Sequence, residues 1–167
     1  ARIFNAAITT GVDVARMCRD YDSVSICLSK GLGAPVGSVL VGSQEFINKA
    51  HRWRKMFGGG WRQAGVLAAA GLYAIDNHVD RLAEDHARAR RVAVAIDAMD
   101  NFSVDLEAVQ SNLVYVNCNI PAADVVASLA EHGIDMFDLP YNRVRVAIHL
   151  HITDEDVERI ITAFAAQ

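Results

Sequence analysis

The sequence predicts an α/β fold in two parts, and three observations support this. An apolar strand at residues 24–28 leads directly into Lys30 and a glycine-rich turn, the pattern of strands that are covered on both faces in parallel sheets. Capped helices alternate with short strands along the rest of the chain. The composition changes near Asp76, after which the helices carry many more charges. We therefore expect residues 1–76 to belong to one domain and residues 77–167 to form a small α+β domain.

The first part is expected to hold four helices and two strands. The helices are predicted at residues 3–9, 14–21, 43–57 and 62–73. Asp13 and Ser43 precede helices and are predicted N-caps. The strands are predicted at residues 24–28 and 38–42, and the Gly and Pro residues between them indicate a hairpin or an adjacent pair.

The second part is expected to be a layer of helices on a sheet. Helices are predicted at residues 79–99, 122–132 and 154–165, the last capped by Thr153. Strands are predicted at residues 104–106, 113–116, 134–136 and 144–148.

The bulk composition excludes several classes of protein. The net charge of the 167 residues is −4, which does not favour binding to nucleic acid or to an anionic membrane. No apolar run approaches the ~20 residues of a membrane span, and no signal peptide is evident.

Cys18, Cys27 and Cys118 form no disulfide or zinc pattern, which predicts a reducing, cytoplasmic setting. His149 and His151 alternate along a strand, but two histidines do not make a metal site, so no metal is expected.

The apolar share of the chain is high. Apolar residues make up 52% of the sequence, and a chain of this length cannot bury them all. We expect some of this surface to be covered by something else. The chain opens at Ala1 with neither Met nor a helix cap, which resembles the middle of a longer protein.

Lys30 is the candidate for covalent chemistry. It stands where the predicted strand leaves the sheet, a usual place for ligands in α/β folds. A lysine at the edge of an apolar core loses solvation, which favours the neutral, nucleophilic amine. A Schiff base with an aldehyde cofactor needs such an amine. The alternative, which spacing alone favours, is a surface lysine in a loop.

Three stretches carry a resemblance to a known family. Residues 22–38 include DSVS and LSKGLGAPVGS, residues 53–65 read WRKM followed by GGGWRQAG, and residues 145–150 read RVAIHL. They resemble the low-specificity L-threonine aldolases, which depend on pyridoxal 5′-phosphate and have the aspartate-aminotransferase fold, fold type I. The resemblance implies that residues 1–76 complete a large cofactor-binding domain and that residues 77–167 form most of the small domain.

The resemblance also implies roles for five residues. Lys30 matches the Schiff-base lysine. Lys55 and Arg62 match residues that reach the cofactor phosphate, partly from the neighbouring subunit, and cations beside a flexible turn suit a phosphate. Arg2 and Arg145 match the pair that binds the substrate carboxylate, which a planar guanidinium grips through two hydrogen bonds.

The residues alone leave alternatives open at these positions. Arg143 and Arg145 share one face of the predicted strand, and only the resemblance favours Arg145; the alternative is an edge-strand charge in water. Arg52 and Arg54 are expected to be solvated. Trp61 departs from the methionine that is more frequent in the family.

The resemblance implies an aldolase that cleaves L-threonine, L-allo-threonine and related β-hydroxy-α-amino acids into glycine and an aldehyde, here acetaldehyde. The chain is expected to be the C-terminal half of such an enzyme, completed by an N-terminal half and assembled as a homotetramer with shared sites. The alternatives are another fold-type-I lyase, such as a β-eliminating one, and a catalytically inactive assembly module.

Overall fold

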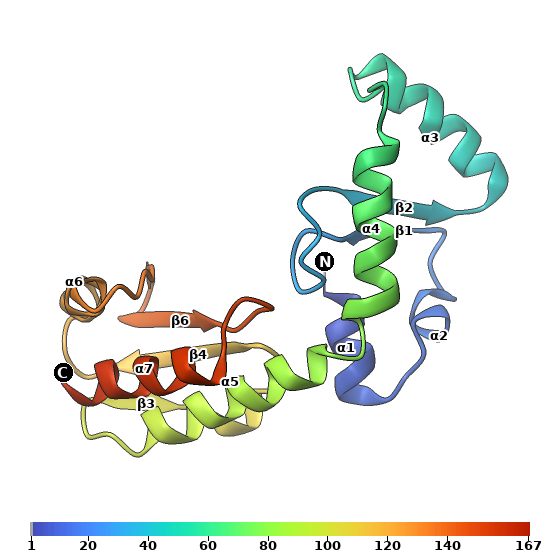
Figure 1. Cartoon of the computed structure of the whole chain (residues 1–167). Helices are drawn as coiled ribbons and strands as arrows, with labels where there is room; N and C mark the ends of the chain where they lie inside the picture. Colours follow the sequence, from blue (N-terminus) through green and yellow to red (C-terminus); the bar gives the residue numbers. More distant parts are fainter. Residues whose placement is uncertain (1) are drawn as a thin grey trace. The chain divides into compact units, whose positions relative to one another are not determined.

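The computed structural model describes residues 2–167, and its contacts divide them into two compact units (Figure 1). Unit 1 extends to Leu82, and unit 2 runs from Ala83 to Gln167. The boundary predicted after residue 76 falls inside helix α4 (Gly65–His78). The assignment of the two parts to a cofactor domain and a small domain stays a prediction.

Unit 1 contains four helices and one hairpin, close to the predicted order. The elements are α1 (Ile3–Thr10), α2 (Val14–Cys18), β1 (Ser23–Cys27), β2 (Ser38–Gly42), α3 (Gln44–Met56) and α4. Both predicted N-caps are confirmed: the Asp13 carboxylate accepts the Ala15 N–H, and the Ser43 hydroxyl accepts the Phe46 N–H. Helix α1 ends where Gly11 adopts a left-handed φ of 68°.

The two strands of unit 1 form an antiparallel hairpin, in which Ser25 pairs with Leu40. This confirms the hairpin alternative and corrects the expectation of a strand covered on both faces in a parallel sheet. Parallel neighbours need a crossover of a dozen or more residues, usually a helix, whereas a glycine-rich turn connects these strands directly. Residues of β1 are half-buried or exposed, and those of β2 are exposed throughout.

The core of unit 1 is small. Five residues are buried in it: Leu28, Leu32, Ala34, Ala74 and Leu82. Several large apolar side chains of α3, α4 and the loop between them are more than half exposed: Trp53, Met56, Phe57, Trp61, Val66, Leu72 and Tyr73. Unit 1 therefore presents the kind of uncovered apolar surface that the composition predicts.

Unit 2 is a four-stranded antiparallel sheet with helices packed on it. The strand order is β3 (Phe102–Val104), β4 (Leu113–Cys118), β6 (Arg143–Ala147) and β5 (Asp138–Leu139). The helices are α5 (Leu82–Asp97), the short 3₁₀ helix η1 (Leu106–Ala108), α6 (Ala122–Glu131) and α7 (Asp154–Ala165). Figure 1 shows α5 and α7 running side by side, and ion pairs from Arg88 and Arg91 to Asp154 join them. The strand predicted at residues 134–136 is irregular chain, and β5 begins only at Asp138.

Alternation along the two central strands creates two different faces. Val114 and Val116 of β4 and Val144 and Val146 of β6 are at most 3% exposed and join the helices in one core. Residues between them, such as Tyr115, lie on the opposite, exposed face. The period of two in the sequence thus separates a packing face from an exposed face.

Phe164 of α7 anchors this core. Its side chain is 1% exposed, and its ring meets that of Phe102 edge-on at 5.1 Å between centroids. We predict that Phe164→Ala lowers the free energy of unfolding of unit 2 by about 3–5 kcal/mol, because it leaves a cavity and removes the aromatic contact. Val94→Ala, at a half-exposed position of α5, should cost less than about 1 kcal/mol. Denaturant unfolding measures both, and equal losses would contradict the central role of Phe164.

Candidate functional site

The turn that carries Lys30 is held by packing on both sides. Gly31 lies so close to α1 that a Cβ there would be 2.7 Å from Asn5 Oδ1. A Cβ on Gly71 of α4 would lie 3.0 Å from Leu28 Cδ1. The Leu32 carbonyl lies 2.6 Å from His78 Nδ1 on α4. Glycines at these two contacts let the turn sit against both helices.

Lys30 itself is exposed, and the Gly33 N–H donates to its carbonyl at 2.9 Å. No carboxylate among residues 2–167 forms an ion pair with its amine. The predicted apolar surroundings of the amine are therefore not supplied by the residues that the structure describes. The physical reason is the hairpin: the strand before Lys30 has a neighbour on one side only.

Arg2 lies at the start of α1, the helix whose Asn5 meets Gly31. Residues three apart share one face of a helix, so Arg2 belongs to the same region of unit 1 as the Lys30 turn. Its side chain is half-buried and already has a partner within the chain.

Cys27, to which the sequence assigned no role, lies just before the Lys30 turn. Its Sγ lies 3.4 Å from Ser29 Oγ. That hydrogen bond, together with the nearby Lys30 charge, lowers the pKa of the Cys27 thiol against the opposing effect of burial.

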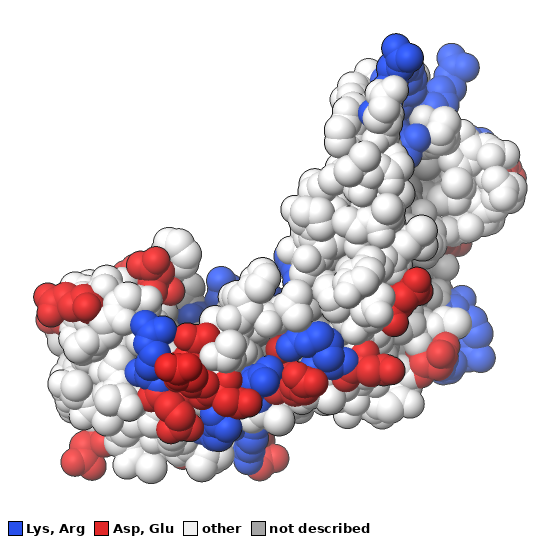
Figure 2. Space-filling model, viewed as in Figure 1, with Lys and Arg blue, Asp and Glu red and all other residues white. Residues whose placement is uncertain are grey.

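The C-terminal end of α3 forms a basic cavity of about 640 Å³. It is lined by His51, Arg52, Arg54, Lys55, Met56, Gly60 and Trp61. The Lys55 side chain lies over Gly60, where a Cβ would overlap it. No Asp or Glu occurs between Glu45 and Asp76 in the sequence. Figure 2 shows Lys and Arg side chains at this end of α3 without acidic neighbours on the visible face.

Of the residues that the sequence singled out near the glycine triplet, two line this cavity and one does not. Lys55 and Trp61 line it, whereas Arg62 lies in the following turn, is exposed and is not part of the lining. Arg52 and Arg54, predicted to be solvated, line it as well. Unpaired cations around a glycine turn form a chemically suitable site for a phosphate.

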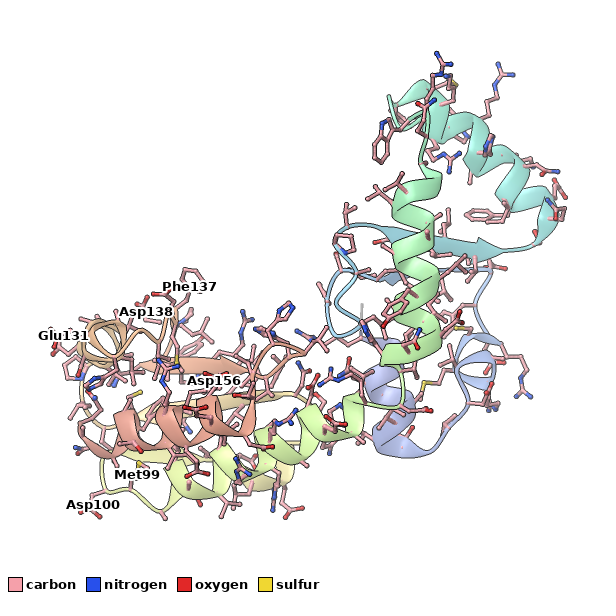
Figure 3. All side chains as sticks on the ribbon, in the orientation of Figure 1. Met99, Asp100, Glu131, Phe137, Asp138 and Asp156 are labelled. Atoms are coloured by element: carbon pink, nitrogen blue, oxygen red, sulfur yellow. The ribbon has the colours of Figure 1, made fainter. Side chains whose placement is uncertain are left out.

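A second cavity, of about 490 Å³, lies within unit 2 along β6. Its lining is apolar for the most part: Ile134, Met136, Phe137, Leu139, Val146, Ala147, Ile152 and Ile160. Its polar lining consists of Asp135, Arg145, His149, His151, Asp156 and Arg159. Figure 3 labels Phe137, on the segment before β5, and Asp156, on α7. An apolar cavity with a few polar groups is the usual form of a small-molecule site.

The structure gives Arg143 and Arg145, which the sequence pattern could not distinguish, different surroundings. The Arg143 guanidinium lies 5.4 Å from the Tyr141 ring centroid, and its Nε donates to the Pro140 carbonyl. Arg145 instead lines the cavity, and within the described chain no carboxylate pairs with it. Arg145 is therefore the arginine that is available to bind an anion.

The other charged pair of this cavity is already neutralised. Arg159 donates to Asp156 Oδ1 at 3.0 Å, and Asp156 Oδ2 accepts the N–H and hydroxyl of Thr153. The hydrogen bond from the Thr153 N–H, then that from its hydroxyl, lowers the pKa of Asp156. Asp156 and Arg159 thus fix the end of α7 that borders the cavity.

The described residues form neither a metal-binding cluster nor a membrane-spanning helix. Residues 2–167 contain no group of three or more His, Cys, Asp or Glu side chains that could hold a metal ion. Within the same range, no helix combines the length and the apolar character that crossing a bilayer requires.

The lowered pKa of Cys27 predicts the effect of its neighbour. Ser29→Ala removes the hydrogen bond that stabilises the thiolate, so alkylation of Cys27 by iodoacetamide near neutral pH should slow several-fold. Mass spectrometry of the Cys27 peptide measures the rate, with Ser25→Ala as the control. Unchanged alkylation in Ser29→Ala would contradict the role of the hydroxyl.

The lowered pKa of Asp156 predicts acid sensitivity. Its ionised form stabilises the folded state above its unfolded pKa of about 3.9, and that contribution disappears as the pH falls through the lower folded value. Asp156→Ala should therefore lower the stability of unit 2 at neutral pH and reduce the loss on acidification, as read from denaturant midpoints. The exposed Asp100 (Figure 3) provides the control Asp100→Ala, and equal acid profiles for the two variants would contradict this account.

Comparison with known proteins places the chain in a family. It is 42% identical over 168 residues to low-specificity L-threonine aldolase 1 of Arabidopsis thaliana, covering 98% of this chain and 47% of that protein. It is 40% identical over 169 residues to the low specificity L-threonine aldolase of Escherichia coli, covering 99% and 49%. The chain thus spans about half the length of the curated relatives it matches.

The fold agrees with the sequence comparison. The crystal structure of a protein titled "putative L-allo-threonine aldolase" from Listeria monocytogenes superimposes with a TM-score of 0.84 at 19% identity, covering 99% of this chain and 50% of that one. A serine palmitoyltransferase from Sphingomonas wittichii superimposes with a TM-score of 0.68 at 21% identity, covering 92% and 41%. The predicted α/β fold class is therefore confirmed. Residues 1–119 match the family described as beta-eliminating lyase, and the chain belongs to that family.

Proposed function

We propose that this chain contributes the C-terminal part of an aldolase that depends on pyridoxal 5′-phosphate. Its reaction cleaves the Cα–Cβ bond of L-threonine, L-allo-threonine and related β-hydroxy-α-amino acids, giving glycine and an aldehyde. The observation that carries this proposal is the 40–42% identity to named threonine aldolases over nearly the whole chain. Lys30, Lys55 and Arg145 all lie in the aligned region.

The residues of unit 1 suit the cofactor in two respects. Lys30 has an exposed amine without an ion-pair partner in the described chain, so it is free to attach an aldehyde. Lys55 lines a cavity whose charged side chains are all cationic, which suits a phosphate. Arg62, in the turn beside that cavity, would add a further cation from the same subunit or its neighbour. When bound, the cofactor ring takes up the electrons of the broken bond.

Two arginines are proposed to bind the carboxylate of the substrate. A guanidinium binds a carboxylate through two parallel hydrogen bonds and so orients the whole amino acid. Arg145 is available for this in its cavity. Arg2 is proposed as the second arginine, near the Lys30 turn. In the reaction the β-hydroxyl loses its proton, the Cα–Cβ bond breaks and the aldehyde leaves, while these residues keep the carboxylate in place.

We propose a homotetramer with shared sites, located in the cytoplasm. The exposed aromatic and aliphatic side chains of α3 and α4 support an assembly, because apolar surface of this extent is costly in water. Three free cysteines suit a reducing compartment.

A second candidate, β-elimination from an amino acid, is favoured by the description of the matched family. The two reactions release different products. Elimination releases ammonia and a keto acid, whereas the aldolase releases an aldehyde and glycine.

Lys30→Ala is the direct test. We expect the wild-type protein, incubated with pyridoxal 5′-phosphate and reduced with borohydride, to carry the mass of the cofactor on Lys30. The variant should carry no such adduct and should lose at least about a thousandfold in aldehyde release from threonine, since covalent catalysis is lost. Lys49→Ala is the matched control, because Lys49 pairs with Glu45 on the exposed face of α3. An adduct on another lysine, or turnover without Lys30, would contradict the assignment.

A further inference from the structure

The cavity of unit 2 holds a polar residue to which the proposed reaction gives no role. His149 follows β6 and lines the same cavity as Arg145. The two residues are four apart, and the residues Val146 and Ile148 are buried in the core. Arg145 and His149 therefore project from the opposite face, with the small side chain of Ala147 between them.

The backbone at His149 is rigidly placed. The Ile148 N–H donates to the Asn112 carbonyl at 2.9 Å, and the Asn112 side-chain amide donates to the Ile148 carbonyl at 2.6 Å. Asn112 is 1% exposed, so these bonds lie in the core. The Ile152 N–H then donates to the His149 carbonyl at 2.8 Å and closes a turn.

One nitrogen of the His149 ring is already used. The His151 N–H donates to His149 Nδ1 at 3.4 Å, so Nδ1 is the acceptor and Nε2 carries the proton of the neutral ring. The His151 ring meets the His149 ring edge-on at 5.7 Å between centroids and limits its rotation. The neutral His149 ring thus has one hydrogen-bond donor, Nε2–H, left for a ligand.

The edge of β6 leaves room for a ligand here. Strand β5 ends at Leu139 and pairs with β6 only up to Val144. The Ile148 N–H donates to Asn112, the residue before β4, and at the other end the Cys118 N–H of β4 donates to Asn142. By the alternation of an antiparallel ladder, the backbone groups of Arg145 and Ala147 point away from β4, toward the open edge.

We propose that His149 is a second ligand-binding residue of this cavity. Its Nε2–H donates to the hydroxyl oxygen of a small hydroxy acid whose carboxylate Arg145 binds. The inference deepens the proposed function and rests on it for the class of ligand. It makes the cavity selective for acids with a hydroxyl group, because an acid without one leaves the donor unpaired.

The test uses two acids that cannot react, 3-hydroxybutyrate and butyrate, which lack the amino group and differ only in the hydroxyl. We expect the wild-type chain, titrated by NMR, to bind 3-hydroxybutyrate about fivefold more tightly, the effect of one hydrogen bond. His149→Phe should abolish this preference, and His149→Gln, which keeps a donor near the position of Nε2, should restore part of it. Arg145→Gln should weaken the binding of both acids.

The control is His132→Gln, an exposed histidine at the end of α6 outside the cavity lining, which should keep the preference. Equal affinity of the wild-type chain for the two acids, or no binding of either, would overturn the proposal. A preference that survives in His149→Phe, with folding confirmed by circular dichroism, would overturn it too. The protein could also prefer 3-hydroxybutyrate, lose that preference in His149→Phe and yet cleave no threonine. That result would support the role of His149 and contradict only the proposed aldolase activity.

Discussion

The strict alternation of side chains along β6 is the constraint on which the unit 2 cavity depends. Val144, Val146 and Ile148 turn inward and are held by the helices, so Arg145 and His149 must turn outward. A slip of one residue in the pairing of β4 with β6 would bury a guanidinium and expose three apolar side chains. The hydrophobic core therefore places Arg145 and His149 on the exposed face of the sheet.

Unit 1 has a small core, and the Lys30 turn itself supplies three of its five buried residues, Leu28, Leu32 and Ala34. Two glycines bring this turn close to the helices. Gly31 leaves room for the Asn5 side chain of α1, and Gly71 of α4 leaves room for the Leu28 side chain. The result is an exposed lysine whose amine forms no ion pair within the described chain.

Much of this arrangement was predictable from the sequence because it is local. The caps at Asp13, Ser43 and Thr153 follow from short polar side chains before helices, and the sheet of unit 2 follows from alternating valines. The prediction for β1 was wrong in one respect. Ser23 and Ser25 alternate with Val24 and Ile26, and Ser25 is exposed, which is the pattern of a strand covered on one face and not on two. The prediction of a strand at residues 134–136 was wrong, because Ile134 and Met136 line a cavity instead of joining a sheet.

The site was harder to predict, because it depends on contacts between distant residues. Nothing in the sequence near Arg143 distinguishes it from Arg145, and the distinction arises from the turn that brings Tyr141 against Arg143. The sequence assigned His149 and His151 no role beyond excluding a metal site, since the cavity that they share with Arg145 is also lined by the segment before β5 and by α7. The alternation of Arg145, Ala147 and His149 was the one available signal.

The open side of β6 has a consequence for solubility. An unpaired strand edge can form hydrogen bonds with a strand of a second molecule. Proteins commonly prevent this pairing with a charged residue at the edge. Arg145 stands at such a place, so its positive charge repels an identical edge in another copy. The charge that makes Arg145 available to an anion in the cavity therefore also disfavours strand pairing between two copies of the chain.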